Sequence, residues 1–485
     1  MTSSRNKLSW ITKLVYGSGD FYGGASATVI AMLFLFFMTD VVGLRPLAAG
    51  FVVFMGRLID AVTDPLMGRI SDRTRSPYGR RSPYFLFASL PVGLSFGMLW
   101  IKAGPPESHL TVVYYTAAYI LFSLAFTTVM VPYAALAPEL TNDYHERTSL
   151  ISFRMAFSIL GALTAAVVPK TLIDRAPSLS QGYVQMGLVF GILFIFIWLN
   201  LFFYMKGRES APVHRDEEKF VPALLSALKN KAFLSLIGIY LFAFIVNDIL
   251  STNFIYYLTY YLKKPDLYTV IMGSLLIVAV LSLSAYVSLT KRVGKRKTFM
   301  IGTAYWMLIL SGLFLLSDTV SSTVVIVFAI LLGIGTGVSY AIPWSMLPEV
   351  IELDQVVTGK RREGLYSGVM TFLRKLSSSV AVLAISFLLE VSGYISSTES
   401  ASVEQPDSAI LTIRLVISLL PLLCLSVALF SAWKFPIRFN NYHYIRMFLN
   451  SRENRDDPIT GDKKKMMEEN LSLMSGRKIC LEENL

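Results

Sequence analysis

Charged residues are scarce in this chain of 485 residues, where Asp, Glu, Lys and Arg together make up 16%. A water-soluble domain carries about 25%, so most of this surface is not suited to water. Hydrophobic residues reach 54%, and the mean hydropathy is +0.55. They come in long blocks such as Val29–Met38 and Leu188–Tyr204, where a soluble helix would show one apolar stripe. The composition predicts an all-α membrane protein that crosses the bilayer many times.

Cysteine and histidine are rarer still, with two and four residues. Cys424 falls in an apolar block and Cys480 in the polar end of the chain, a spacing that fits neither a disulfide framework nor a metal site. The histidines all fall outside the apolar blocks: His109, His145, His214 and His443. No GxxxxGK[ST] phosphate-binding loop occurs in a cytoplasmic segment. We therefore expect no enzyme, no cofactor and no direct use of ATP.

A bilayer core of about 30 Å requires about 20 apolar residues per helix. That length predicts twelve spans, near residues 12–40, 46–71, 83–103, 110–136, 149–173, 182–206, 232–262, 268–290, 298–317, 322–347, 364–392 and 409–434. No small-residue cleavage site follows the first block, so we expect it to remain as a span. The expected organisation is a six-helix lobe at 1–206, a cytoplasmic linker at 207–231, a six-helix lobe at 232–436 and a disordered cytoplasmic tail at 437–485.

Basic residues outnumber acidic ones by 44 to 33, which gives a net charge of +11. They lie mostly in short loops between apolar blocks, so we expect a lipid bilayer and no nucleic acid as partner. One set of loops holds most of them: Arg73, Arg75, Arg80 and Arg81, then Lys291, Arg292, Lys295, Arg296 and Lys297, then Lys360, Arg361 and Arg362. Cytoplasmic loops are the basic ones, so both termini and the linker are expected in the cytoplasm.

Two of these basic loops indicate an internal repeat. Gly68–Arg81 reads GRISDRTRSPYGRR and joins the second and third spans, and Thr290–Lys297 reads TKRVGKRK and joins the eighth and ninth. The first loop resembles the signature of the major facilitator superfamily. Within it, the chain resembles the glycoside–pentoside–hexuronide:cation symporter family, which includes melibiose permease, and also the related sodium-dependent lysophosphatidylcholine symporters. Five motifs carry this resemblance: Thr39–Leu44 (TDVVGL), Arg57–Gly68 (RLIDAVTDPLMG), Val131–Leu140 (VPYAALAPEL), Pro343–Val350 (PWSMLPEV) and Arg361–Lys375 (RREGLYSGVMTFLRK).

The resemblance implies two lobes that open alternately to each side of the membrane, and uptake driven by a cation gradient. In the second span, Asp60, Thr63 and Asp64 recur at i, i+3 and i+4, so one helical face presents two carboxylates and a hydroxyl as ligands for a small cation. The family places its coupling cation on the matching residues, and Thr127 matches a further hydroxyl position. The alternative is a purely structural salt bridge from Arg57 to Asp60. Sodium, lithium and protons all remain open as the coupling ion.

Arg154 and Lys375 are basic residues inside spans, and both match family positions that line the pocket. They are expected to hold the substrate or to pair with Asp60 and Asp64, unless they form a permanent ion pair across the lobes. Gly23 and Gly24 stand where melibiose permease has a sugar-binding Lys–Asp pair. Met130 and Ala134 likewise replace its Asp and Trp, so a simple galactoside is not the expected substrate. Further candidates in spans are Asp20, which is equally suited to a helix–helix hydrogen bond, and Tyr340 and Trp344, which could equally be packing residues. In the seventh span, polar contacts could come from Asn247, Asp248 and Asn253, with Tyr256 and Tyr257.

The loops are expected to supply a gate. Asp72 would hold Arg80 or Arg81 beside Arg73, while Glu349 and Glu352 would form a latch with Arg361 and Arg362. Anchoring of these basic residues to anionic lipid is the alternative. The sequence thus predicts a monomeric symporter of a cell membrane, in bacteria the inner membrane, that imports a sugar or glycoside derivative with sodium or protons. An amphipathic lipid such as a lysophospholipid is the alternative substrate, and a membrane enzyme or receptor is the alternative class.

Overall fold

The computed structural model describes residues 8–106, 108–141, 143–208, 225–398, 403–453 and 462–475, and these residues form helices and loops without a strand. The first lobe contains α1 (Trp10–Val29), η1 (Ile30–Phe34), α2 (Leu35–Phe37), η2 (Met38–Val42), α3 (Pro46–Arg73), α4 (Ser82–Met98), α5 (His109–Leu140), α6 (Tyr144–Asp174) and α7 (Leu179–Met205). The second contains α9 (Lys231–Tyr256), η3 (Tyr257–Tyr261), η4 (Pro265–Leu267), α10 (Tyr268–Val293), α11 (Lys295–Leu315), α12 (Ser322–Thr358), α13 (Glu363–Val391), α14 (Asp407–Ile417) and α15 (Leu419–Lys434). Two more helices, α16 (Tyr442–Glu453) and α17 (Asp462–Ser475), follow.

The predicted spans agree with these helices within about five residues, except that α12 continues to Thr358, beyond the predicted end of the tenth span at residue 347. Eleven helices among the described residues are long and apolar enough to cross a membrane. The twelfth is α4, which has 17 residues and packs on α5 and α7, so it crosses with them although it is short. The first span runs continuously from α1 through η2, the seventh from α9 through η3, and the twelfth combines α14 and α15. The predicted twelve-helix fold is therefore confirmed.

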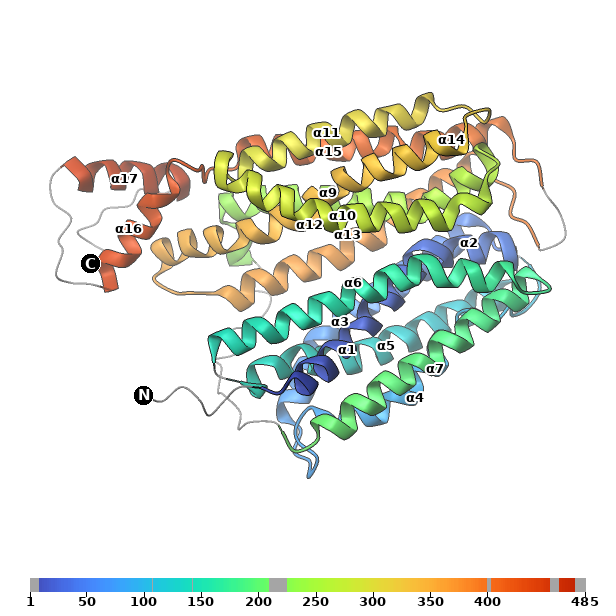
Figure 1. Ribbon diagram of the computed structural model, residues 1–485, viewed down its shortest axis with the longest axis horizontal. Coiled ribbons are helices and arrows are strands. Elements are labelled where there is room, and N and C mark those ends of the chain that lie inside the picture. Colours follow the sequence, from blue (N-terminus) through green and yellow to red (C-terminus); the bar gives the residue numbers. More distant parts are fainter. Residues whose placement is uncertain are drawn as a thin grey trace.

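The helices form two lobes that lie side by side, with α1–α7 in one and α9–α15 in the other (Figure 1). Within the first lobe α1 packs along α6, and close approach of their backbones requires glycine. A Cβ at Gly24 would lie 2.1 Å from the Ser158 carbonyl oxygen, and one at Gly161 would lie 2.3 Å from that of Phe21. Small residues at such crossings are how membrane helices pack without a hydrophobic driving force. Between the lobes, α13 packs on α3 and α10 packs on α6.

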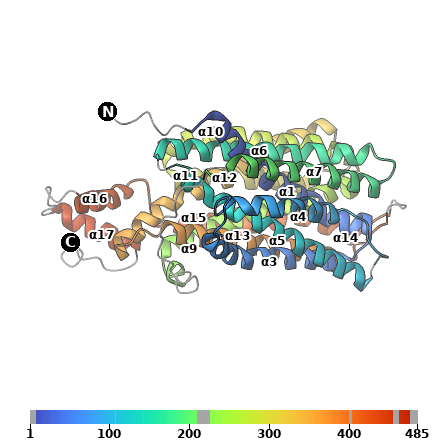
Figure 2. The same ribbon diagram turned by 90° about the horizontal axis from the view of Figure 1, so that it is seen from below.

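The two ends of the bundle differ. The tail end carries α16, α17 and the start of α1, and the far end carries the loops that follow η2 and α13 (Figures 1 and 2). We use "tail end" and "far end" in this sense below. The expected linker falls mostly outside the described residues, which resume with a short helical stretch at 225–228.

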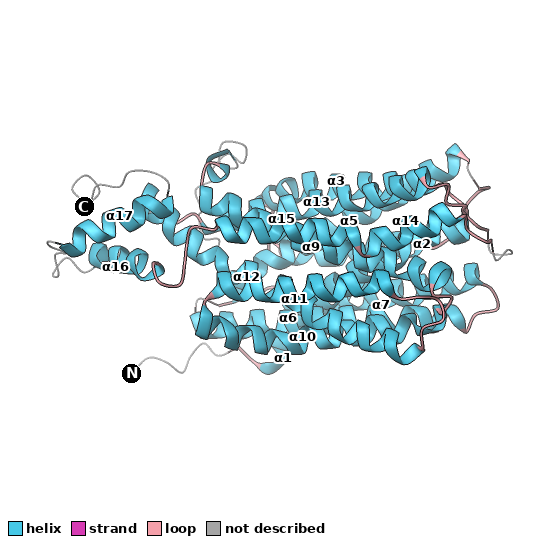
Figure 3. Cartoon of the chain, turned by 90° about the horizontal axis from the view of Figure 1, so that it is seen from above, coloured by secondary structure: helices cyan, strands magenta, loops and turns pink. Residues whose placement is uncertain are grey.

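The expectation of a disordered tail is wrong for 442–453 and 462–475, which form α16 and α17. Both helices project from the bundle (Figure 3). Their low overall hydropathy hides a few apolar residues at helical spacing: Ile445 and Phe448 are fully buried, as is Leu471. α16 and α17 pack on each other and on α12. A short apolar stripe is therefore enough to hold each of these helices in place, because it packs on the surface that the bundle already provides.

Candidate functional site

The centre of the molecule brings together the acidic residues predicted in α3 and the lysine predicted in α13. Lys375 Nζ lies 2.7 Å from Asp60 Oδ2 and 2.5 Å from Asp64 Oδ2. α3 belongs to the first lobe and α13 to the second, so this ammonium joins the lobes. All three side chains are mostly buried, and their contact excludes much of the surrounding solvent. The i, i+4 spacing of the two carboxylates is what lets one ammonium contact both.

Thr127 in α5 completes this cluster. Its Oγ1 lies 2.7 Å from Asp60 Oδ1 and 3.0 Å from Asp64 Oδ1. A hydroxyl has one hydrogen, so it donates to one carboxylate at a time. Thr63 stands behind it, with its Oγ1 3.4 Å from that of Thr127 and 3.3 Å from the Asp60 carbonyl oxygen. The structure thus gathers four oxygen-bearing side chains in one cluster, and two of them, the carboxylates, contact the ammonium.

Arg57 and Asp60 both lie in the described part of the chain, and they do not form the alternative salt bridge. Asp60 is paired with Lys375 instead. Counting the contacting side chains, two carboxylates face one ammonium, which leaves a formal charge of −1. A surplus negative charge in a buried site is costly unless a further cation compensates it. The cluster therefore has the ligand atoms and the charge to accept one monovalent cation.

Arg154 lies elsewhere and does not pair across the lobes. Its Nε donates to Asp20 Oδ2 at 2.9 Å, and its guanidinium lies 5.2 Å from the centre of the Tyr133 ring. Tyr133 and Tyr16 exchange hydrogen bonds with each other's backbone carbonyls, at 2.7 and 3.2 Å, and their rings stack. This network ties α1, α5 and α6 into one rigid unit.

Packing accounts for the two glycines on α1. A Cβ at Gly23 would lie 2.9 Å from Asp20 Oδ1 and 2.8 Å from the Met130 side chain. The space that a Lys or Asp would need there is filled, and at Gly24 it is taken by the α6 backbone. The replacement of the sugar-binding pair is therefore structural as well as chemical.

Sequence reasoning missed a second arginine–carboxylate pair, in the second lobe. Arg374 Nη1 and Nη2 donate to Asp248 Oδ2 and Oδ1 at 2.7 and 2.8 Å. The signal was present in the sequence, because Arg374 adjoins Lys375 and Asp248 is one of few acidic residues inside a span. The neighbouring Asn247 is used within the lobe, where its Nδ2 donates to Ser339 Oγ at 2.8 Å.

The far end joins the lobes through hydroxyl groups around Asp40. Tyr394 donates to Asp40 Oδ1 at 2.7 Å, and Tyr260 donates to the same carboxylate. Tyr256, predicted as a substrate or coupling residue, is fully buried here with its hydroxyl 2.8 Å from Thr39 Oγ1. The participating turns of the first and seventh spans, η2 and η3, are both π-helical, a distortion often found at functional sites. This closure was not predicted, although the TDVVGL motif contains Thr39 and Asp40.

At the tail end of the first lobe, the predicted loop network is present. Arg81 Nη2 lies 2.6 Å from Asp72 Oδ1, and its Nε lies 2.9 Å from Glu139 Oε1. Arg80 also donates to Glu139, which sequence reasoning did not single out. Arg73 ends α3 and is exposed. The buried Glu139 carboxylate thus binds the loop to the end of α5.

The predicted latch of the second lobe has different partners. Glu349 pairs with Lys295 at 2.8 Å, and Glu352 accepts a hydrogen bond from the Tyr442 hydroxyl of α16 at 2.7 Å. Burial raises the pKa of Tyr442 above its usual range, and the adjacent carboxylate raises it further, so this hydroxyl stays protonated. The expected pairing of Glu349 and Glu352 with the basic loop is therefore corrected.

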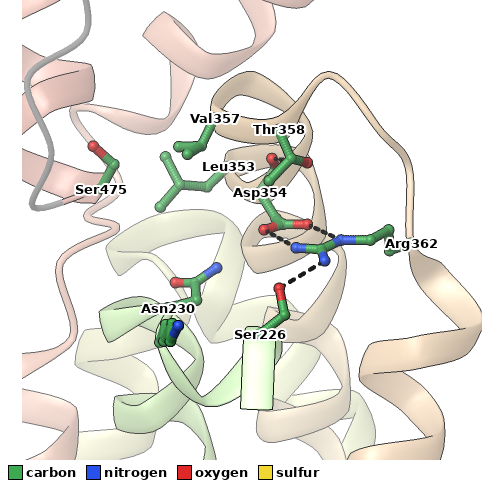
Figure 4. A pocket seen from close by; sticks show the side chains of 9 residues that line it. Ser226, Asn230, Leu353, Asp354, Val357, Thr358, Arg362 and Ser475 are labelled. Carbon is green, nitrogen blue, oxygen red and sulfur yellow. Dashed lines mark hydrogen bonds and ion pairs between the residues drawn. The ribbon is translucent and has the colours of Figure 1, made fainter. Parts of the chain in front are cut away.

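The two arginines of that loop bind nearby groups instead. Arg361 pairs with Glu363 at 2.7 Å on the surface. Arg362 binds Asp354 at 2.9 and 2.8 Å and also donates to Ser226 Oγ at 2.9 Å, in a pocket that Ser475 of α17 borders (Figure 4). Each arginine of this loop pairs with the carboxylate that lies nearest in space. The spacing of residues in the sequence does not show which carboxylate that is.

Comparison with known proteins agrees with this architecture. The family model described as MFS/sugar transport protein matches residues 15–438. The chain is 29% identical to an uncharacterised symporter of Synechocystis sp., over 93% of this chain and 98% of that one. It is 26% identical to the glucuronide carrier protein homolog of Escherichia coli strain K12, over 94% and 99%. It is 24% identical to the sodium-dependent lysophosphatidylcholine symporter 1-A of Danio rerio, over 90% and 88%.

Solved structures share the fold at lower identity. The nucleoside transporter NupG matches with a TM-score of 0.62 at 13% identity, over 88% of this chain and all of that one. The Escherichia coli xylose transporter XylE matches with a TM-score of 0.62 at 15% identity, over 90% and 98%. The helical lobes, the matching family model and these relatives together identify the chain as a multi-pass membrane symporter that belongs to the MFS/sugar transport protein family.

Proposed function

We propose that this symporter uses a sodium gradient to import a sugar or glycoside derivative by alternating access. The observation that carries the proposal is the bridge from Lys375 to Asp60 and Asp64. In this arrangement the ammonium stands where a small cation would bind, and the cluster retains a charge of −1. Sodium entering between the carboxylates and Thr127 would displace Lys375 and release a contact between the lobes. Hard oxygen ligands of this kind favour small hard cations.

Several contacts support a mechanism in which this state opens toward the tail end. Hydrogen bonds join the lobes at the far end through Asp40, Thr39 and the tyrosines of the second lobe. The ion pairs Arg81–Glu139 and Lys295–Glu349 at the tail end lie within single lobes. With the basic loops and both termini in the cytoplasm, the state is inward-facing. Cleavage of an added C-terminal tag by protease, in inside-out vesicles but not in intact cells, tests this orientation.

A lysophospholipid is the second candidate substrate. It is favoured by the loss of space for sugar-binding side chains at Gly23 and Gly24, and by the lysophosphatidylcholine symporters among the relatives. The polar side chains that remain between the lobes favour the sugar. Testing each substrate in the same vesicles, with and without a cation gradient, separates the question of the substrate from the question of coupling.

The deciding experiment is uptake into proteoliposomes containing the purified full chain, with glycosides, hexuronides and lysophosphatidylcholine offered separately. We expect glycoside uptake that requires inward sodium and is lost in Asp64→Asn. Exchange of one ammonium for one cation at these carboxylates further predicts one sodium ion per substrate. Uptake of the same glycoside at equal rates without any sodium or proton gradient would contradict the coupling, and sodium-driven uptake of lysophosphatidylcholine alone would replace the substrate.

A further inference from the structure

The second lobe holds an ion pair that the cation cluster does not use. Arg374 and Asp248 form two parallel hydrogen bonds, at 2.7 and 2.8 Å. A guanidinium has five N–H donors, so three remain beyond this pairing, and each carboxylate oxygen keeps a further lone pair. The pair therefore presents hydrogen-bond donors and acceptors next to each other. Its side chains are not sealed off, since Arg374 is 22% exposed and Asp248 is 9% exposed.

Aromatic rings surround this pair. The Arg374 guanidinium lies 4.9 Å from the centre of the Phe244 ring, which contacts the edge of Tyr340 at a centroid distance of 5.3 Å. One turn away on each helix, Tyr240 meets Trp344 at 5.6 Å. Tyr340 and Trp344 lie four residues apart on α12 and are 43% and 40% exposed, so both keep uncovered surface on the same side of this helix.

The position of the pair argues against a purely structural role. α13 packs on α3 of the first lobe and on α9 of its own, so Arg374 lies on a helix of the lobe interface. The next residue, Lys375, reaches the cation cluster. A buried arginine–carboxylate pair is commonly no more stabilising than apolar residues of the same volume. Binding of a ligand therefore explains an arginine–carboxylate pair beside exposed aromatic rings better than a gain in stability does.

We propose that Asp248 and Arg374, with the exposed face of Trp344, form a subsite for vicinal hydroxyl groups of a sugar ring. Two adjacent hydroxyls each donate and accept, which matches the mixed donors and acceptors of the pair. The C–H face of the ring packs on the indole, which buries apolar surface. This inference rests on the proposed symport and narrows its substrate class to polyhydroxylated rings.

The charge balance sets the selectivity of this subsite. Asp248 neutralises Arg374, so the subsite carries no net charge and does not require an anionic substrate. A phosphate group bound to the remaining N–H donors of Arg374 would lie next to the Asp248 carboxylate, which repels it. Arg374 of the sugar subsite and Lys375 of the cation cluster are adjacent residues of α13. Binding of the sugar ring and binding of the cation therefore both change the contacts of this helix.

The test compares ligand binding with sodium binding in the full chain in nanodiscs. The probes are methyl glucopyranoside, methyl galactopyranoside, methyl xylopyranoside, methyl glucuronide and lysophosphatidylcholine, followed by thermal shift and calorimetry. The double variant Asp248→Asn/Arg374→Gln removes both charges; Asn keeps the shape of Asp, and Gln is a shorter uncharged side chain that fits in the space of Arg. The control Lys170→Gln/Asp174→Asn removes an ion pair within α6, away from this subsite.

We expect the double variant and Trp344→Ala to weaken binding of the best neutral glycoside at least tenfold. Their sodium affinity should stay within twofold of the parent, and the control should match the parent for both ligands. Arg374→Lys, which keeps the charge but not the planar fork, should also lose glycoside affinity; it serves if the double variant does not fold.

Unchanged glycoside affinity in the double variant and in Arg374→Lys would overturn the subsite, while sodium-driven uptake would leave the symport proposal standing. A parent protein that binds none of the neutral glycosides, or only lysophosphatidylcholine, would overturn it as well. Conversely, glycoside binding that depends on Asp248 and Arg374 but does not respond to sodium would keep the subsite and remove the coupling.

Discussion

Replacing Lys375 by glutamine should tighten sodium binding. The Lys375 ammonium contacts both Asp60 and Asp64, so a cation must compete with it for the same oxygens. Glutamine is close in size to lysine but carries no charge. In the variant, two carboxylates would face each other without a compensating cation, and the site would attract sodium more strongly.

The magnitude follows from the geometry. At the 2.7 Å of the Lys375–Asp60 contact, two unit charges interact by about 6 kcal/mol at an effective dielectric constant of 20. Desolvation offsets much of this attraction, and breaking a buried pair costs about 3–5 kcal/mol in measured cases. In Lys375→Gln, sodium binds without displacing an ammonium, so part of the cost of breaking the ion pair is no longer subtracted from its binding free energy. Because about 1.4 kcal/mol corresponds to a tenfold change, we expect a sodium Kd lower by roughly 10- to 100-fold.

Calorimetric titration with sodium chloride, at an ionic strength held constant with choline chloride, measures this directly. Lys170→Gln is the matched control, because Lys170 pairs with Asp174 within α6 and should leave the sodium Kd unchanged. An unchanged or higher Kd in Lys375→Gln, with Lys170→Gln equal to the parent, would refute the idea that the ammonium occupies the cation position.

Three other substitutions test the surrounding structure. Glu139→Gln removes the carboxylate that holds Arg80 and Arg81, and should cost about 3–5 kcal/mol; its melting temperature should fall, whereas that of the exposed Glu363→Gln should not. Gly56→Ala places a Cβ 1.5 Å from a tyrosine ring of α5, so its yield of monodisperse protein in size-exclusion chromatography should collapse, while Gly68→Ala, whose nearest neighbour lies at 3.9 Å, should be normal. Tyr394→Phe removes a hydroxyl bound to the far-end carboxylate and should speed hydrogen exchange of the η3 backbone; unchanged exchange would argue against this closure.

The fold followed from the sequence because lipid imposes a simple rule. Each span must hold its own backbone hydrogen bonds and face apolar solvent, so length and hydropathy identify it. The face of α3 that carries Asp60, Thr63 and Asp64 was equally predictable, since helical periodicity places residues at i, i+3 and i+4 together. Both inferences need only one helix.

Partners on different helices were harder to predict. The cross-lobe bond from Tyr394 to Asp40 joins residues 354 positions apart, and nothing in either local sequence specifies it. Arg362 selected Asp354 rather than the two glutamates nearby because the loop after α12 turns back on the helix end. Helical periodicity in the sequence predicts which residues share a face of one helix. Which residue of another helix contacts that face depends on how the helices pack.

The contrast between the two lobe contacts has a consequence for coupling. The far end is held by neutral hydroxyls around one carboxylate, whereas the centre is held by a lysine whose place a cation can take. On the proposed mechanism, sodium alone would release the central bridge but leave Arg374 bound to Asp248. A sugar ring at that pair would then shift α13, which carries both basic residues. The lobes would therefore move with both ligands bound or with neither, because the emptied carrier must also return, and this requirement is what distinguishes a symporter from a leak.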